Sequence, residues 1–98
     1  MTTQGQRIKK IRQALGLSQE QFGVIFDIKK QFVSSLEKDK TFLNNDKLVK
    51  LLVDFNVNIN YLLAGKGNMF NAPQYEDVKG EILKEVDEIL VKYGVKNS

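Results

Sequence analysis

The sequence predicts an all-α protein, with a compact five-helix domain over residues 1–70 and a linker with an amphipathic helix over residues 71–98. Three observations support this. Apolar residues recur at helical spacing, and no stretch of the first 70 residues alternates with period two for long, so we expect no sheet. Residues typical of helix caps stand at the boundaries of the periodic stretches. A length of 98 residues leaves room for a single domain.

Capping boxes predict the starts of the first two helices. Thr3 and Gln6 form one such pair, and Gly16 suits the left-handed residue that often ends a helix. Ser18 and Gln21 form the second pair. A turn of a few residues then leads into a third helix.

Asparagines predict the starts of the next two helices. Asn44 or Asn45 can cap the fourth, and Asn58 can cap the fifth, which stops at Gly65. The core face of the fourth helix consists of Leu48, Leu51, Leu52 and Phe55. The fifth helix carries three more apolar residues, which are Ile59, Leu62 and Leu63. In the second and third helices we expect these residues in the core: Phe22, Phe26, Ile28, Val33 and Leu36. We expect one of Val24 and Ile25 to be exposed.

The missing residue types narrow the possible functions. The chain has no cysteine, histidine or tryptophan, which excludes disulfides, zinc sites of the usual Cys/His kind, cysteine nucleophiles and Ser-His dyads. We therefore expect no enzyme, no cofactor and no metal site. No apolar run reaches the 18 or more residues of a membrane span, and no signal-peptide core follows Met1. We expect a cytoplasmic protein.

Charge is unevenly distributed along the chain. Residues 1–70 hold eleven Lys/Arg and six Asp/Glu, whereas residues 71–98 hold four Lys and six acids. The basic segment 1–70 favours an anionic partner, and the acidic segment 71–98 indicates a separate function.

Residues 17–40 carry the pattern most informative about function. Two short helices joined by a tight turn cross at a large angle, so the second projects with one face free. A protruding helix fits the major groove of DNA, where base edges present readable donors and acceptors. Lys29, Lys30 and Gln31 stand at its start, at the positive end of the helix dipole. The spacing and the chemistry both favour DNA binding.

The same residues resemble the lambdoid-repressor and Cro helix-turn-helix family of regulators, over roughly residues 5–70. The residues that carry the resemblance are Leu17, Ser18, Gln19, Glu20, Phe22 and Gly23, then Val33, Ser34, Leu36 and Glu37. It continues through the fourth helix to residues 58–65. The resemblance implies a lambda-repressor-like domain with a supporting helix over 18–26 and a recognition helix over 29–37, which binds double-stranded DNA.

The resemblance also implies roles for single residues. The residues implied to contact bases are Lys30, Gln31, Ser34 and Ser35. Those implied to contact the DNA backbone or to make auxiliary contacts are Gln19, Lys29, Phe32, Lys38 and Lys40. Arg12 and Glu37 match a structural ion pair between the first helix and the recognition helix. Two positions depart from the family pattern. Asp27 replaces the turn glycine, and Lys29 replaces the Ser/Thr cap and cannot accept the capping hydrogen bond.

A sixth helix is predicted from about Tyr75 to Tyr93. Its apolar residues fall within an arc of about 140° at 100° per residue: Tyr75, Val78, Ile82, Leu83, Val86, Ile89, Leu90 and Tyr93. Such a stripe either folds back on the five-helix body or pairs with another subunit. We favour a homodimer, because one helix-turn-helix unit reads only a half-site. The dimer residues would be Tyr75, Val78, Ile82, Val86, Ile89 and Tyr93.

Taken together, these patterns predict a homodimeric, phage-type transcriptional repressor that binds a palindromic operator. Two alternatives share the fold and also bind operators: the antitoxin of a toxin–antitoxin pair and the controller of a restriction–modification system. An antitoxin is expected to copurify with a second small protein, a partner that the sixth helix could hold. A third alternative, of another class, is a protein-interaction module that does not bind DNA.

Overall fold

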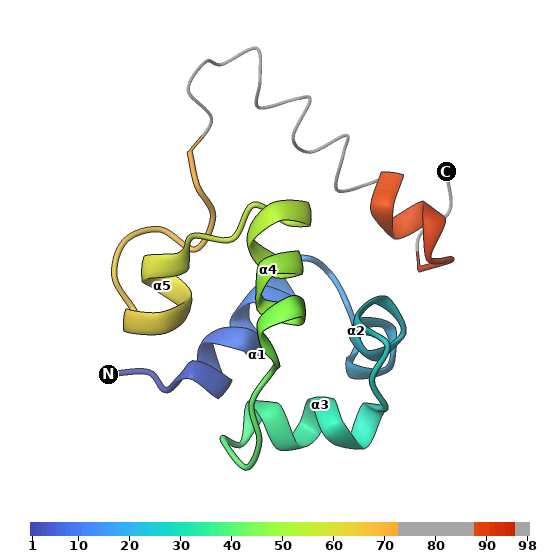
Figure 1. Cartoon of the computed structure of the whole chain (residues 1–98), viewed down its shortest axis with the longest axis horizontal. Helices are drawn as coiled ribbons and strands as arrows, with labels where there is room; N and C mark the ends of the chain where they lie inside the picture. The colour runs from blue at the N-terminus through green and yellow to red at the C-terminus, as the bar shows by residue number, and fades with distance from the viewer. Residues whose placement is uncertain (73–87, 96–98) are drawn as a thin grey trace.

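The computed structural model describes residues 1–72 and 88–95, and this part of the chain is α-helical (Figure 1). The helices are α1 (Gln4–Ala14), α2 (Gln19–Phe26), α3 (Lys30–Glu37), α4 (Asn45–Asp54) and α5 (Ile59–Ala64). A further helical stretch covers residues 88–92. Within the described residues the β pairing is one isolated antiparallel bridge, Val57 with Phe70. The all-α prediction is confirmed.

Both predicted capping boxes form. The Thr3 hydroxyl accepts the Gln6 N–H at 3.2 Å, and the Gln6 side chain accepts the Thr3 N–H at 2.9 Å. Ser18 and Gln21 make the same pair of bonds, at 3.0 and 2.8 Å. Because Ser18 is the cap, α2 begins one residue later than predicted.

The asparagine caps also form. Asn44, rather than its neighbour, caps α4 and accepts the Lys47 N–H at 3.0 Å. Asn58 caps α5 and accepts the Asn60 N–H at 3.0 Å. Gly65 ends α5 in the left-handed conformation, with φ of +70°. Local chemistry therefore determines where these helices begin and end.

The core lies where the five helices meet. At its centre the Phe22 and Phe26 rings stack with centroids 4.4 Å apart, and Phe55 lies 5.8 Å from Phe26. Buried apolar residues come from every helix, and they include Ile8, Ile11, Phe22, Ile25, Phe26, Val33, Leu36, Leu51, Phe55 and Leu62. The core prediction is confirmed for Phe22, Phe26, Val33 and Leu36.

Several apolar side chains lie at the edge of this core. Ile28 is half-buried rather than buried, because it belongs to the turn between α2 and α3. Leu51 of α4 and its C-cap residue Phe55 are buried, while Leu48 and Leu52 are half-buried. The exposed large apolar residues include Val24, Ile59 and Leu63, and the neighbouring Ile25 is buried.

Residues 88–95 pack against the five-helix part of the same chain (Figure 1). Leu90 is buried there. Tyr93 accepts a hydrogen bond from the Lys50 ammonium, whose nitrogen lies 4.3 Å from the Tyr93 ring centroid. Of the predicted dimer residues, Ile89 and Tyr93 pack against this core, and four lie outside the described residues: Tyr75, Val78, Ile82 and Val86.

Candidate nucleic-acid interface

Three residues connect α2 to α3. Asp27 adopts the left-handed conformation, with φ of +54°, and ends α2. The Ile28 N–H donates to the Gly23 carbonyl at 2.8 Å, which turns the chain sharply away from the α2 axis. Lys29 is the N-cap of α3, with no side-chain capping bond, so α3 begins one residue later than predicted. A left-handed Asp is less costly than most non-glycine residues, and the turn therefore forms without the family's glycine.

Gly23 allows this turn to lie close to α2. A β-carbon at Gly23 would lie 2.4 Å from the Ile28 carbonyl oxygen. Backbone atoms cannot move aside as a flexible side chain would, so the close approach requires glycine. Gly5 has a similar role in α1, where a β-carbon would lie 2.3 Å from the Leu36 carbonyl oxygen of α3.

The end of α3 is closed by a Schellman motif. Asp39 has φ of +60°, and its N–H donates to the Leu36 carbonyl at 3.1 Å. The Lys40 N–H donates to the Ser35 carbonyl at 2.9 Å. These bonds end the helix and leave Lys38, Asp39 and Lys40 exposed.

Asp39 also caps α1. Its carboxylate accepts the Gly5 N–H at 2.9 Å, one of the free donors in the first turn of α1. Hydrogen bonds from the Thr3 hydroxyl and from this N–H lower the pKa of the Asp39 carboxyl group below its ordinary value, because they favour the ionised form. The end of α3 is thereby attached to the start of α1.

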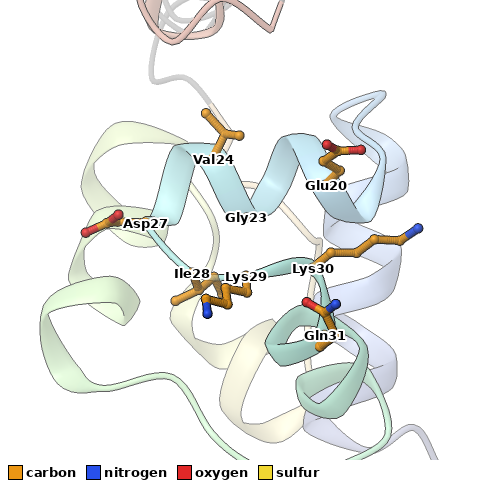
Figure 2. Close-up of a pocket in the computed structure, with 8 residues that line it drawn as sticks. All are labelled: Glu20, Gly23, Val24, Asp27, Ile28, Lys29, Lys30 and Gln31. Carbon is orange, nitrogen blue, oxygen red and sulfur yellow. The ribbon is translucent and has the colours of Figure 1, made fainter.

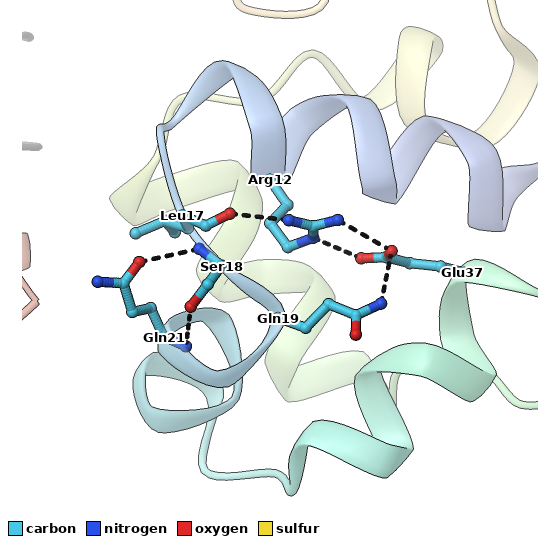
Figure 3. Close-up of polar contacts among 6 residues, drawn as sticks. All are labelled: Arg12, Leu17, Ser18, Gln19, Gln21 and Glu37. Atoms are coloured by element: carbon cyan, nitrogen blue, oxygen red, sulfur yellow. Dashed lines mark hydrogen bonds and ion pairs between the residues drawn. The ribbon is translucent and has the colours of Figure 1, made fainter.

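A buried ion pair joins α1 to α3 (Figure 3). Arg12 donates from Nε to Oε2 of Glu37 at 2.7 Å and from Nη2 to Oε1 at 3.2 Å. The two side chains are only 10% and 5% exposed. Arg12 Nη1 donates to the Leu17 carbonyl at 2.8 Å, and Gln19 Nε2 donates to Glu37 Oε1 at 3.1 Å. The network connects α1, the start of α2 and the end of α3.

The pairing implied for Arg12 and Glu37 is therefore present as a contact. For Gln19, the structure adds a contact that the sequence did not indicate. Its amide nitrogen is bound to Glu37, so the side chain is held against α3 at the N-terminus of α2.

Arg7 has a structural role that sequence reasoning missed. It is buried, and its guanidinium donates to the Leu62 carbonyl at 2.9 Å, to the Leu63 carbonyl at 3.3 Å and to the Thr2 carbonyl. It thus satisfies carbonyls in the last turn of α5. The one sequence signal is its position four residues before the buried Ile11, which places it beside the apolar face of α1.

Helix α3 has a buried side and an exposed side. Val33, Leu36 and Glu37 face the protein and are buried. At about 100° per residue, Gln31 and Ser35 lie on the opposite side. The exposed predicted site residues are Lys29, Lys30, Gln31, Phe32, Lys38 and Lys40, and the half-buried ones are Gln19, Ser34 and Ser35. The four predicted base-contacting residues therefore all project from α3 without being enclosed by the protein.

A family model described as a helix-turn-helix domain matches residues 5–68, from α1 through α5. The chain belongs to the helix-turn-helix domain family. Comparisons with curated proteins and with solved structures gave no match. In this helix-turn-helix domain the motif itself is α2, the turn at Asp27–Lys29 and α3. Such motifs place the second helix in the major groove, which makes this a DNA-binding domain of regulatory type.

The start of the recognition helix is the most positive part of the helix-turn-helix motif. Among the described residues, the backbone N–H groups of Lys30 and Gln31 have no acceptor. These donors, the helix dipole and the exposed Lys29 ammonium group together favour a negatively charged ligand such as DNA phosphate. A hollow beside this start is lined by Glu20, Gly23, Val24, Asp27, Ile28, Lys29, Lys30 and Gln31, with Lys30 and Gln31 on its α3 side (Figure 2).

Within residues 1–72 and 88–95, no helix has the length and apolar character needed to cross a membrane. In the same stretches, no cluster of three or more acidic, histidine or cysteine side chains is arranged to hold a metal ion.

Proposed function

We propose that the chain is a sequence-specific transcriptional regulator of the lambdoid-repressor and Cro type, acting as a homodimer at a palindromic operator. One observation carries the proposal. The exposed side of α3 presents Gln31 and Ser35, with Lys30 and Ser34 on one flank, while the buried side is fixed by core packing and by the Glu37 network. A rigid helix with a free polar face is what base reading in the major groove requires.

The side chains divide into two classes of contact. Gln31 suits adenine, because its amide both donates and accepts, and Lys30 suits the guanine acceptors O6 and N7. Ser34 and Ser35 supply short hydroxyl groups on the same side. Lys29, Lys38 and Lys40 are exposed at the two ends of α3, where they suit phosphates. Gln19 supports a phosphate contact at the start of α2, with its amide oriented by Glu37.

Homodimerisation would supply the second half-site. Dimeric readers place two recognition helices about 34 Å apart on one face of DNA. The proposed pairing surface is the apolar stripe of the C-terminal helix. Of the proposed pairing residues, Ile89 and Tyr93 pack on their own chain, and the others lie outside the described residues: Tyr75, Val78, Ile82 and Val86. Repression would be steric, since an occupied operator excludes polymerase.

Selection of bound sequences from a random duplex pool tests the function. We expect an inverted repeat whose half-sites are centred about one helical turn apart. Three phosphate-binding lysines in each protomer of a dimer predict a roughly thousandfold loss of affinity between 50 and 200 mM salt. A pool that yields no enriched sequence and no salt-dependent binding would favour the protein-interaction module. A second small protein that copurifies with the chain and strengthens operator binding would favour the antitoxin role.

A further inference from the structure

A second hollow lies on the opposite flank of α3 from Lys30. It is lined by Ile28, Lys29, Gln31, Phe32 and Ser35. Ile28 is half-buried, and Phe32 is 37% exposed, so their apolar surfaces are accessible beside the polar side chains of Gln31 and Ser35. The hollow therefore offers an accessible apolar surface next to the proposed base-reading side chains Gln31 and Ser35.

The backbone around the two apolar side chains is held in place before any ligand arrives. The Ile28 N–H is bound to the Gly23 carbonyl at 2.8 Å, and the Phe32 N–H is bound to the Lys29 carbonyl at 2.9 Å. The first hollow, beside the start of α3 next to Lys30, differs from this one because the carboxylates of Glu20 and Asp27 line it. The two flanks of α3 therefore present different surfaces to a duplex.

We propose that the hollow between Ile28 and Phe32 takes the 5-methyl group of a thymine, next to the base pair that Gln31 reads. The methyl group of thymine is the apolar feature of the major-groove edges, and phenylalanine is one of the side chains that contact it. This inference rests on the proposed function and adds a specificity rule to it: each half-site contains a thymine that is recognised through its methyl group.

Single replacement of each operator thymine by deoxyuridine tests this rule, because it removes the methyl group and leaves the base pairing intact. We use the duplex selected from the random pool and measure its affinity for the full chain. At one thymine in each half-site, we expect this replacement to lower the affinity about fourfold, which is the effect of removing one buried methyl group. In Phe32→Ala, the same replacement should change affinity less than twofold.

Two further variants separate the methyl contact from a general loss of structure. Val49→Ala removes an apolar side chain of similar exposure, 44%, from α4 and should keep the fourfold difference. Phe32→Leu should keep part of it, and thermal unfolding of every variant checks the fold.

The outcomes distinguish this inference from the proposed function. The inference is overturned if uracil is tolerated at every position, which is also the result expected if Phe32 contacts a sugar. It is equally overturned if the selected half-site lacks thymine, or if Phe32→Ala keeps the full difference. Failure to select any duplex would instead contradict the proposed function.

Discussion

Replacing Glu37 with alanine is expected to lower the free energy of unfolding by about 3–5 kcal/mol. The guanidinium of Arg12 would remain buried after losing both carboxylate contacts, and an unpaired buried charge is costly. Gln19 would lose its acceptor as well. Urea denaturation followed by circular dichroism measures the change.

Two controls show whether the buried charge is the cause. Glu20→Ala removes an exposed carboxylate from α2 and should change stability by no more than about 0.5 kcal/mol. The double variant Arg12→Met with Glu37→Leu removes both charges, so it should recover most of the stability lost in Glu37→Ala. If Glu37→Ala is as mild as Glu20→Ala, the ion pair does not hold α1 to α3.

Replacing Gly23 with alanine is expected to destabilise the domain by about 3 kcal/mol. Helix propensity alone predicts the opposite sign, because alanine is favoured over glycine within a helix by about 1 kcal/mol. The steric effect should dominate, since the new β-carbon would lie 2.4 Å from the Ile28 carbonyl oxygen, in the turn that leads into α3. DNA affinity should fall with stability because the turn orients α3.

Val24→Ala is the matched control for Gly23→Ala. Val24 is the next residue of the same helix, and its side chain is 56% exposed, so its loss should be nearly neutral. A Gly23→Ala variant that is as stable as the parent, or more stable, would show that the turn can shift without cost and would contradict the close packing of α2 and the turn.

Features controlled by neighbouring residues were predicted from the sequence. The capping boxes at Thr3 and Ser18 depend on residues three positions apart, and so do the helix starts that they define. The left-handed Asp27 and the uncapped Lys29 lie at the two positions where the family resemblance marked a departure from the usual residues. Helical periodicity was sufficient to place Phe22, Phe26 and Leu36 in the core.

Features that depend on distant segments were not predicted from local patterns, and the pairing of Arg12 with Glu37, 25 residues apart, was implied only by the family resemblance. Two of the carbonyls that Arg7 binds lie 55 and 56 residues further along the chain, and the N–H group that Asp39 binds lies 34 residues earlier. No local pattern marks such partners. The packing of Leu90 on the body was one of two arrangements that amphipathicity allowed, because an apolar stripe shows that a surface is covered but does not identify what covers it.

The central claim is that the exposed side of α3 reads base edges while its flanking lysines bind phosphates. Titration of Lys30→Ala, Gln31→Ala and Lys40→Ala against the selected operator and a random duplex tests it most directly. For Lys30→Ala and Gln31→Ala, we expect a loss of about 1–3 kcal/mol on the operator and little change on the random duplex. Lys40→Ala should weaken binding to both duplexes about equally. If all three variants lose affinity equally on both duplexes, α3 does not read the sequence and the claim is wrong.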